Sequence, residues 1–496
     1  MKHAVLTSGS PVAAAGPRNG ARTGELVVLG IAIAAVAASV VYAAAQFMGI
    51  AIVACGFVAA LLVAPIGLRW ATGRFDVFEP AMIIAGVYLF YFVFGPLARI
   101  ATEDFWFLDR NFQSVYVPAL EAIAVAVAAM WVGYALPVGP TPALAGEPPS
   151  PIAAASMESG QRMARMLVTA AVLGMVAWAR LSGHSLLYFL LPGVTRPVDS
   201  AEGGVDVPYL FFAVEWFIPA VTVLIALGGL RGRATRAAVI GVLTVMYVSI
   251  GFRYRVAILW FAVAIVTYLR AGRRPRLLYM AVPATLAFLL GGWLAGARAF
   301  FRSNGAEGTL AFDLRGSVVG GLSDTRIFET LGAVVTTVPR FLPHAGLLPF
   351  AYPLILLVPR SLWPGKPLPF WLQYNVQSIG TPPSTTSGAA VPHFGEFYIA
   401  FGWAGIALGM FLFGLAAKWL WRWYRAAPND PWRQAIFALN SSLLFLTIAR
   451  GYLAQIVQEW CFVVLPAIAL AALARRRARF ALSAGAGARA EVVEGA

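Results

Sequence analysis

The chain has 496 residues, of which 60% are hydrophobic and only 12% are charged, and its mean hydropathy is +0.76. Soluble domains carry about 25% charged residues, so this composition excludes an ordinary soluble protein. The net charge of +15 could indicate nucleic-acid binding in a soluble protein, but the orientation of membrane helices explains most of it here. We therefore expect a membrane protein with no nucleic-acid partner.

Residues 1–24 are small and polar and contain no short apolar core followed by a cleavage site. This pattern predicts a disordered cytosolic tail rather than a signal peptide. The transmembrane domain is predicted over residues 25–474, and a basic cytosolic tail over 475–496. Cys55 and Cys461 both lie inside apolar runs, which favours small buried side chains over a disulfide.

Apolar stretches of about 17–22 residues can cross the roughly 30 Å hydrocarbon core as helices. Their pattern predicts an all-α polytopic membrane protein with about twelve transmembrane helices. The predicted spans are 25–45, 48–67, 79–98, 118–138, 165–182, 209–229, 237–252, 256–270, 278–296, 397–417, 434–449 and 456–474.

Arginine clusters at 231–236, 270–276 and 475–479 fall on one side of the membrane when the N-terminus is cytosolic. Positive loops resist translocation, so this side is predicted to be the cytosol, and both termini are predicted to lie there. The inner segment 139–161 is rich in Pro and Gly and is predicted to be a flexible linker.

The outer segments are predicted to be 99–117, 183–208 and a large periplasmic loop, 297–396, between the ninth and tenth helices. Within this loop, the apolar stretch 347–358 contains two prolines and is too short to span, which favours a re-entrant or interfacial segment.

Two pairs of arginines are predicted at outer helix ends. Arg253 and Arg255 lie in the turn Gly251-Phe-Arg-Tyr-Arg255, and their planar guanidinium groups could bind phosphate oxygens bidentately. Snorkelling to lipid headgroups is the alternative. Arg298 and Arg302 are four residues apart and could extend the same positive rim, or could simply stabilise a helix C-terminus.

The most distinctive string is Val358-Pro-Arg-Ser-Leu-Trp-Pro-Gly-Lys-Pro367, in which three prolines stiffen a turn. Its cations Arg360 and Lys366, with Trp363 beside them, could hold a diphosphate next to a sugar ring. An interfacial Trp with flanking cations is also common in membrane proteins that bind no such ligand.

Further candidates follow the long loop. Glu396 is placed at the start of the tenth helix, where it could cap the helix, pair with an arginine or act as a general base, and His393 is the rival base. Arg450 could join the outer rim or mark a helix end. Glu215 and Glu459 lie in apolar runs, so each requires a partner or access to water.

Two sequence motifs are missing. The chain contains no Gly-x-x-x-x-Gly-Lys-Ser/Thr loop and no His-Glu-x-x-His, so nothing indicates an ATPase or a metalloprotease. We expect no cofactor and no metal.

The turn Gly251–Arg255, the string Pro359–Pro367 and the segment Gly395-Glu-Phe-Tyr398 to Gly405, together with a large outer loop, resemble the O-antigen polymerase (Wzy-like) family. The resemblance covers residues 237–474. It implies a GT-C-like membrane glycosyltransferase of the bacterial inner membrane. Such an enzyme polymerises undecaprenyl-diphosphate-linked oligosaccharide repeat units into a surface or secreted polysaccharide on the periplasmic face.

The resemblance also implies roles for residues. Catalysis is assigned to Glu396 or His393, and binding of the lipid diphosphate to the cations Arg253, Arg255, Arg360 and Lys366, with Arg298 and Arg450 as further members. The implied partners are lipid-linked oligosaccharides, membrane lipids, a chain-length regulator and a flippase.

Three other functions fit the same sequence features. An O-antigen ligase would transfer the finished glycan to a lipid A core instead of to a repeat unit. A flippase or other transporter would also use many helices and a basic cavity, but should place its charges along mid-membrane helix faces. A structural subunit of an envelope assembly would leave glycan length unchanged when its arginines are neutralised.

Overall fold

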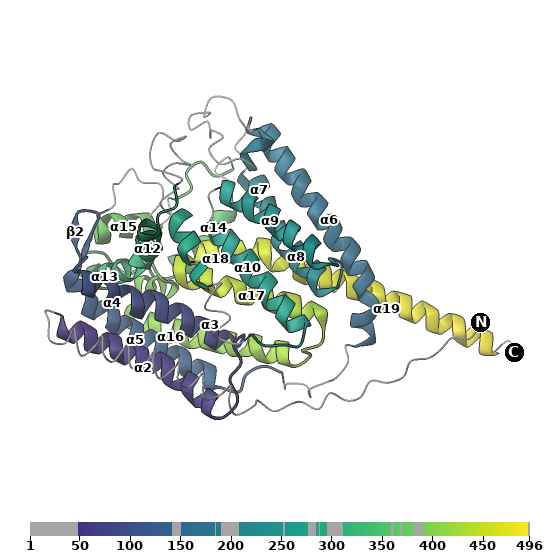
Figure 1. Cartoon of the computed structure of the whole chain (residues 1–496), viewed down its shortest axis with the longest axis horizontal. Coiled ribbons are helices and arrows are strands. Elements are labelled where there is room, and N and C mark those ends of the chain that lie inside the picture. Colours follow the sequence, from purple (N-terminus) through teal and green to yellow (C-terminus); the bar gives the residue numbers. More distant parts are fainter. Residues whose placement is uncertain are drawn as a thin grey trace.

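The computed structural model describes residues 48–140, 150–183, 185–189, 208–250, 253–275, 284–286, 288–294, 311–358, 362–367, 370–380 and 390–494. Within these residues the chain is a bundle of helices with one short β-hairpin, β1 (Trp106–Phe107) and β2 (Arg110–Asn111) (Figure 1). The predicted tail 1–24 and the predicted first span, 25–45, lie outside the described residues.

In the described residues up to 270, the main helical elements follow one another in chain order. They are α2 (Gly49–Ala71), α3 (Pro80–Leu89), α4 (Gly95–Thr102), α5 (Tyr116–Ala135), α6 (Pro151–Leu181), α7 (Pro208–Phe211), the 3₁₀ segment η4 (Phe212–Trp216), α8 (Phe217–Ala226), α9 (Arg233–Ser249) and α10 (Arg253–Arg270). The π segment η1 (Phe90–Phe94) joins α3 to α4 without a break.

The described residues from 311 onward contain both short and long helices. They are α12 (Leu314–Ser323), α13 (Ile327–Thr337), α14 (Leu348–Leu357), α15 (Phe370–Ile379), α16 (His393–Arg425), α17 (Pro431–Arg450), α18 (Leu453–Val463) and α19 (Leu465–Glu494). The predicted interfacial stretch 347–358 is the ten-residue helix α14, with Pro353 inside it.

Six helices in the described residues are long and apolar enough to cross a membrane, which supports a membrane-embedded all-α protein. They are Gly49–Ala71, Pro80–Thr102, Gln113–Ala135, Pro151–Leu181, His393–Arg425 and Leu453–Ser483. Helices α9, α10 and α17 coincide with predicted spans but do not belong to these six. Twelve crossings therefore remain a prediction.

The predicted linker 139–161 is wrong in its second part. Helix α6 begins at Pro151, where proline fits the first helical position, and the Ser150 side chain accepts a hydrogen bond from the Ala153 N–H. Residues 151–161 are therefore helical, and α6 is a 31-residue helix.

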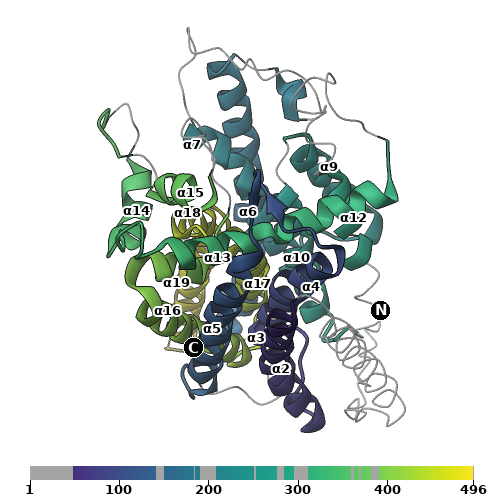
Figure 2. The ribbon, with the colours of Figure 1, turned by 90° about the vertical axis from the view of Figure 1, so that its left-hand side faces the viewer.

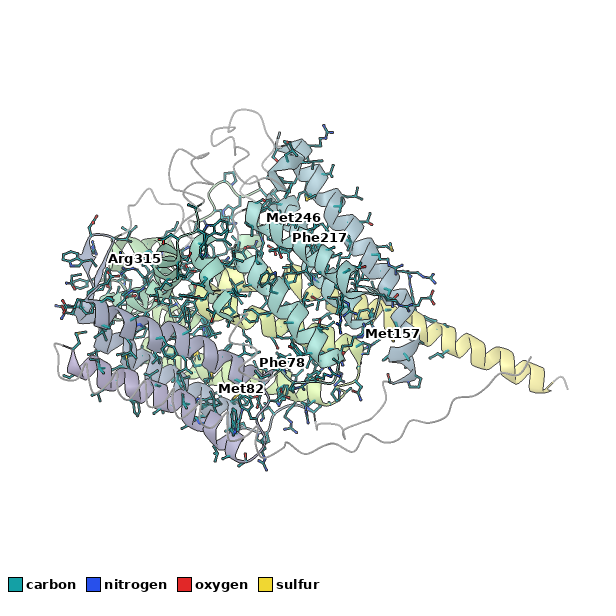
Figure 3. All side chains as sticks on the ribbon, in the orientation of Figure 1. Phe78, Met82, Met157, Phe217, Met246 and Arg315 are labelled. Atoms are coloured by element: carbon teal, nitrogen blue, oxygen red, sulfur yellow. The ribbon has the colours of Figure 1, made fainter. Side chains whose placement is uncertain are left out.

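Buried side chains form two clusters, which fill the spaces between the helices (Figure 3). The first cluster, with Met82 as a labelled member, joins α2, α3, α5, α13 and α16. The second, with Phe217 and Met246, joins α6, α8, α9, α10, α17 and α19. Small residues allow the closest approaches: a Cβ added at Gly133 would overlap the Phe411 carbonyl, and one at Gly414 would overlap the Met130 carbonyl, so α5 and α16 pack backbone to backbone.

Helix α16 consists of two helical segments that fold back on each other. Phe401 and Gly402 have non-helical backbone angles, and the positive φ of Gly402 (64°) suits glycine. In a straight helix, His393 and Phe413 would lie roughly 30 Å apart, but their ring centroids are 4.8 Å apart. Segment 393–400 therefore runs antiparallel to segment 403–425. The predicted tenth span, 397–417, is wrong at its start.

The bend in α16 leaves backbone carbonyls that need donors. The Ala345 N–H donates to the Ile399 carbonyl (2.8 Å), and the Gly346 N–H donates to the Ala400 carbonyl (3.1 Å). A membrane interior tolerates a broken helix only where such groups are satisfied by protein. The loop before α14 thus completes the hydrogen bonds of the folded-back segment.

Gly405 supplies a test of this fold. Its added Cβ would overlap the Phe397 carbonyl oxygen, so Gly405→Ala should force the two segments of α16 apart and destabilise the protein by about 1–3 kcal/mol. Gly86→Ala is the matched control, because nothing lies within 4 Å of a Cβ there. Thermal unfolding in detergent should show a lower Tm only for Gly405→Ala; equal melting of the two variants would contradict the folded-back arrangement.

The predicted cytosolic cations gather at one end of the bundle. Arg69 pairs with Glu79 (2.7 Å), Arg274 with Asp76 (2.8 Å) and Arg475 with Asp430 (2.5 Å). A cavity of about 590 Å³ beside them is lined by Arg74, Lys418, Arg422 and Arg425, among other residues. We call this the basic end.

The short helices lie at the other end, which we call the opposite end. Figure 2 shows α12, α13 and α15 spread across it. Arg326, just before α13, pairs with Asp104 after α4 (2.7 Å). The described parts of segment 297–396 are therefore mostly short helices rather than an extended loop, and their periplasmic location remains a prediction.

Candidate active site

The folded-back segment of α16 carries both predicted bases. His393 is its first residue and is buried, with its Nε2 atom 3.4 Å from the Tyr88 hydroxyl of α3. Its ring also contacts Phe394, Phe397 and Phe413. His393 therefore lies in an aromatic environment inside the first cluster.

Glu396 lies one turn further along the same segment and is 1% exposed. Its Oε2 atom accepts a hydrogen bond from the Leu453 N–H (2.7 Å), which is the first residue of α18. A carboxylate is stabilised at this position because the N-terminal N–H groups of a helix carry partial positive charge. Its other oxygen, Oε1, has no hydrogen-bond partner among the described residues. Glu396 therefore caps a neighbouring helix with one oxygen and has the second available.

The α17–α18 turn packs against the start of the folded-back segment. Gly451 has φ 61° and packs so closely on the Val391 carbonyl that a Cβ would overlap it. Tyr452 lies within range of the charges of both Glu396 and Arg450, and its hydroxyl accepts a hydrogen bond from Asn375 of α15 (3.0 Å). Among the predicted phosphate-binding cations that the structure describes, Arg450 is the one closest in sequence to the helix that Glu396 caps, because it lies three residues before Leu453.

A second group of buried ionisable residues lies in the other cluster. Arg255 of α10 pairs with Glu215 of η4, and the neighbouring Tyr254 hydroxyl donates to the Oε1 atom of Glu459 on α18 (2.9 Å). Glu215, Arg255 and Glu459 are each 2% exposed or less. Glu215 and Glu459 were each predicted to require a partner. Those partners are Arg255 and Tyr254 of α10, respectively.

The burial of Arg255 corrects the prediction of an open anion site. We expected its guanidinium at the outer mouth of the membrane domain, but it is 1% exposed, bound to a carboxylate and close to the ring of Phe211 (5.3 Å). A buried arginine is stable only with such compensation. In this structure its charge stabilises the Glu215 carboxylate.

Helix α18 connects the two groups. Glu396 caps it at Leu453, and Glu459 lies six residues further along, a rise of roughly 9 Å. The predicted residues Glu396, Arg450 and Arg255 therefore gather around one short helix although they are distant in sequence.

Lys366 has a structural role in this arrangement. It is 9% exposed and donates hydrogen bonds to the carbonyls of Leu356 (3.1 Å) and Val358 (2.9 Å). These carbonyls lie at the C-terminus of α14, where a cation is stabilised by the helix dipole. Its predicted role in diphosphate binding must therefore compete with these bonds. Trp363 is 41% exposed, which fits both a sugar-binding and an interfacial side chain.

Three predicted arginines cannot be placed in the site. Arg298 and Arg360 lie outside the described residues, and the side chain of Arg253 is likewise not described, although its backbone begins α10. Their assignment to diphosphate binding stays a prediction.

Sequence analysis missed another buried pair. Arg99 of α4 binds both oxygens of Glu329 on α13 (2.9 and 3.2 Å), and the Tyr116 hydroxyl donates to the same carboxylate (3.0 Å). Burial raises the pKa of Glu329, while Arg99 opposes this shift. Arg99 inside an apolar run was the only sign of this pair in the sequence. Its partner could not be found from the sequence, because Glu329 lies 230 residues away.

The chemistry available here is that of carboxylates, arginines and hydroxyls. In the described part of the chain, no group of three or more His, Cys, Asp or Glu side chains could hold a metal ion. A buried carboxylate with one unpaired oxygen can accept a proton from a hydroxyl, and a nearby arginine can stabilise an anion that forms beside it.

Comparisons with protein families, curated proteins and solved structures find no match for this chain.

Proposed function

We propose that this protein is a membrane glycosyltransferase that polymerises oligosaccharide repeat units carried on a lipid diphosphate. The single observation that carries the proposal is Glu396, a buried carboxylate with one uncommitted oxygen, on a folded-back helical segment that caps the helix after Arg450. The arrangement offers a proton acceptor, with a cation three residues before the N–H group that it caps.

In the proposed reaction, the hydroxyl of a lipid-linked acceptor donates a hydrogen bond to the Glu396 Oε1 atom. Glu396 accepts the hydroxyl proton while the hydroxyl oxygen forms a bond to the anomeric carbon of the donor sugar. The bond from that carbon to the diphosphate breaks, and its electron pair leaves with the lipid diphosphate. Arg450 stabilises the negative charge on the leaving group.

A reconstituted assay tests the proposal. Purified protein in liposomes, supplied with lipid-linked repeat units extracted from the host cell, should convert them into a ladder of longer glycans. The Arg450→Gln variant should form the ladder at least ten-fold more slowly, because it lacks the cation beside the leaving group. Repeat units that stay single in the presence of wild-type protein would refute the polymerase, and extension only after addition of a lipid A core would identify the ligase variant.

A specific observation favours a second candidate, a transporter of lipid-linked oligosaccharides. Such a protein should carry charges inside its helical bundle, and Glu215, Arg255 and Glu459 are such charges. Two carboxylates facing one arginine leave an excess negative charge when both are ionised, which a transported proton could neutralise. In the same liposomes, a transporter would move repeat units across the membrane without lengthening them.

A further inference from the structure

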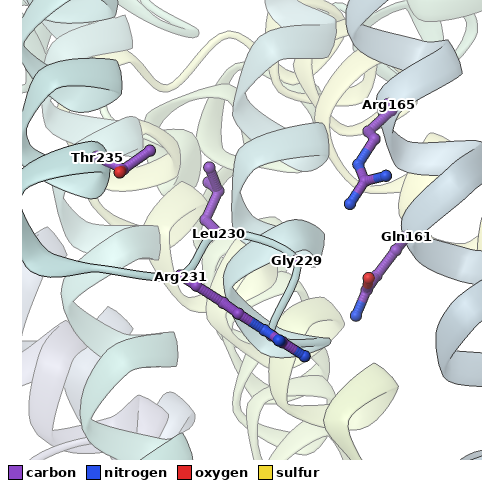
Figure 4. A pocket seen from close by; sticks show the side chains of 7 residues that line it. Gln161, Arg165, Gly229, Leu230, Arg231 and Thr235 are labelled. Carbon is purple, nitrogen blue, oxygen red and sulfur yellow. The ribbon is translucent and has the colours of Figure 1, made fainter.

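A cavity at the basic end lies away from the candidate active site. It has a volume of about 500 Å³ and is lined by Gln161 and Arg165 of α6, the backbone of residues 228–230, Arg231 and Thr235. Figure 4 shows Arg165 and Gln161 extending from α6 toward the loop, while Arg231 extends from the loop toward α6. Two guanidinium groups therefore approach one space from opposite sides.

The lining of this cavity has one sign of charge. None of its lining residues is acidic, and neither Arg165 nor Arg231 has an ion-pair partner among the described residues. Arg236 and Arg270 lie close behind, near enough for the charges of Arg231 and Arg236 to act on Arg270. Four arginines around a cavity whose lining contains no acidic residue produce a positive potential that attracts an anion.

The loop between α8 and α9 is fixed by its neighbours. Gln161 donates to the Leu227 carbonyl (2.7 Å), Arg236 donates to the Leu230 carbonyl (3.0 Å), and Arg270 donates to the Ile225 carbonyl. These bonds occupy carbonyl oxygens that would otherwise repel an anion. Gly228 has φ 78°, which lets the chain turn sharply after α8. The loop backbone that leads to Arg231 is therefore held in place by the protein itself.

We propose that this cavity binds the phosphate headgroup of an anionic phospholipid. The cavity lies at the end of the bundle where cations gather, next to helices with apolar membrane-facing surfaces, such as Met166 and Leu173 on α6, which are 69% and 63% exposed. Guanidinium groups bind phosphate oxygens bidentately, and basic pockets between membrane helices suit lipid headgroups. The acyl chains would lie along the exposed face of α6, which a soluble phosphate would leave uncovered.

Lipid retention tests this proposal on the full chain. Wild-type protein and the double variant Arg165→Gln/Arg231→Gln are purified in detergent with phosphatidylglycerol and phosphatidylcholine, and native mass spectrometry measures the bound lipids. At about 1 kcal/mol for each basic residue, loss of both arginines should weaken phosphatidylglycerol binding roughly thirty-fold. Phosphatidylcholine binding should not change. Both side chains are exposed, so the variant should fold normally, which Tm measurement verifies.

A matched control removes the same charge elsewhere on α6. Arg162→Gln/Arg180→Gln also lowers the net charge by two, but neither residue lines the cavity, and Arg162 already pairs with Glu158. This control should retain phosphatidylglycerol like the wild type. If both double variants lost phosphatidylglycerol equally, the binding would depend on general surface charge rather than on this cavity, which would overturn the proposal. Competition by millimolar inorganic phosphate would overturn the lipid as ligand in favour of a soluble anion.

Discussion

Replacement of Glu396 by Gln is expected to slow glycan polymerisation by a factor of roughly 10²–10⁴, the contribution typical of a general base. Glutamine has the same shape and keeps a carbonyl oxygen for the Leu453 N–H, so the cap on α18 remains. The oxygen that lacks a partner loses its ability to take up a proton. Gel analysis of the cell's surface polysaccharide should therefore show single repeat units in place of a long ladder.

Two further variants separate this effect from its alternatives. Glu158→Gln removes a carboxylate from an exposed position on α6 and should leave the ladder unchanged. His393→Gln tests the rival base, and a severe defect there with normal polymerisation in Glu396→Gln would reassign the role to His393. A full ladder in both variants would exclude the proposed chemistry at this segment.

Much of the helical architecture could be predicted, because apolar stretches of membrane-spanning length are a strong signal. Segments such as Pro80–Thr102 and Gln113–Ala135 form helices close to their predicted positions. The fold-back of α16 could not be predicted. The sequence around the bend, from Phe397 to Trp403, carries no charged residue, and Gly402 alone does not distinguish a bend from a continuous helix. The contacts of Ala345 and Gly346 that stabilise the bend come from another part of the chain.

The candidate site was predictable in residue type but not in pairing. An ionisable side chain in an apolar run predicts a buried partner, and Glu215 and Glu459 follow this rule. The rule does not name the partner, because Arg255 lies 40 residues from Glu215 in sequence. The long sequence separation also explains why Arg255 was predicted at an open surface. Its position near a helix end indicated access to water, because the sequence did not show the Glu215 carboxylate that favours its burial.

Replacement of Arg255 by Met is expected to destabilise the protein by about 3–5 kcal/mol, because it leaves Glu215 ionised and buried without a counter-charge. The double variant Arg255→Met/Glu215→Leu removes both charges and should recover most of the lost stability, since an apolar pair suits the second cluster. Thermal unfolding in detergent measures both effects. A double variant as unstable as Arg255→Met would contradict the pairing.

The recovered double variant also separates the two proposed functions. A polymerase that uses Glu396 and Arg450 requires the Arg255–Glu215 pair only for folding, so the folded double variant should still lengthen glycans. A transporter that neutralises its buried carboxylates with a proton requires their charge directly, so the same variant should fold and yet move no repeat units. Because the change lies around the part of α18 that is far from Glu396, a folded double variant that lengthens no glycans would mean that the charges of Arg255 and Glu215 act on the reaction through that helix.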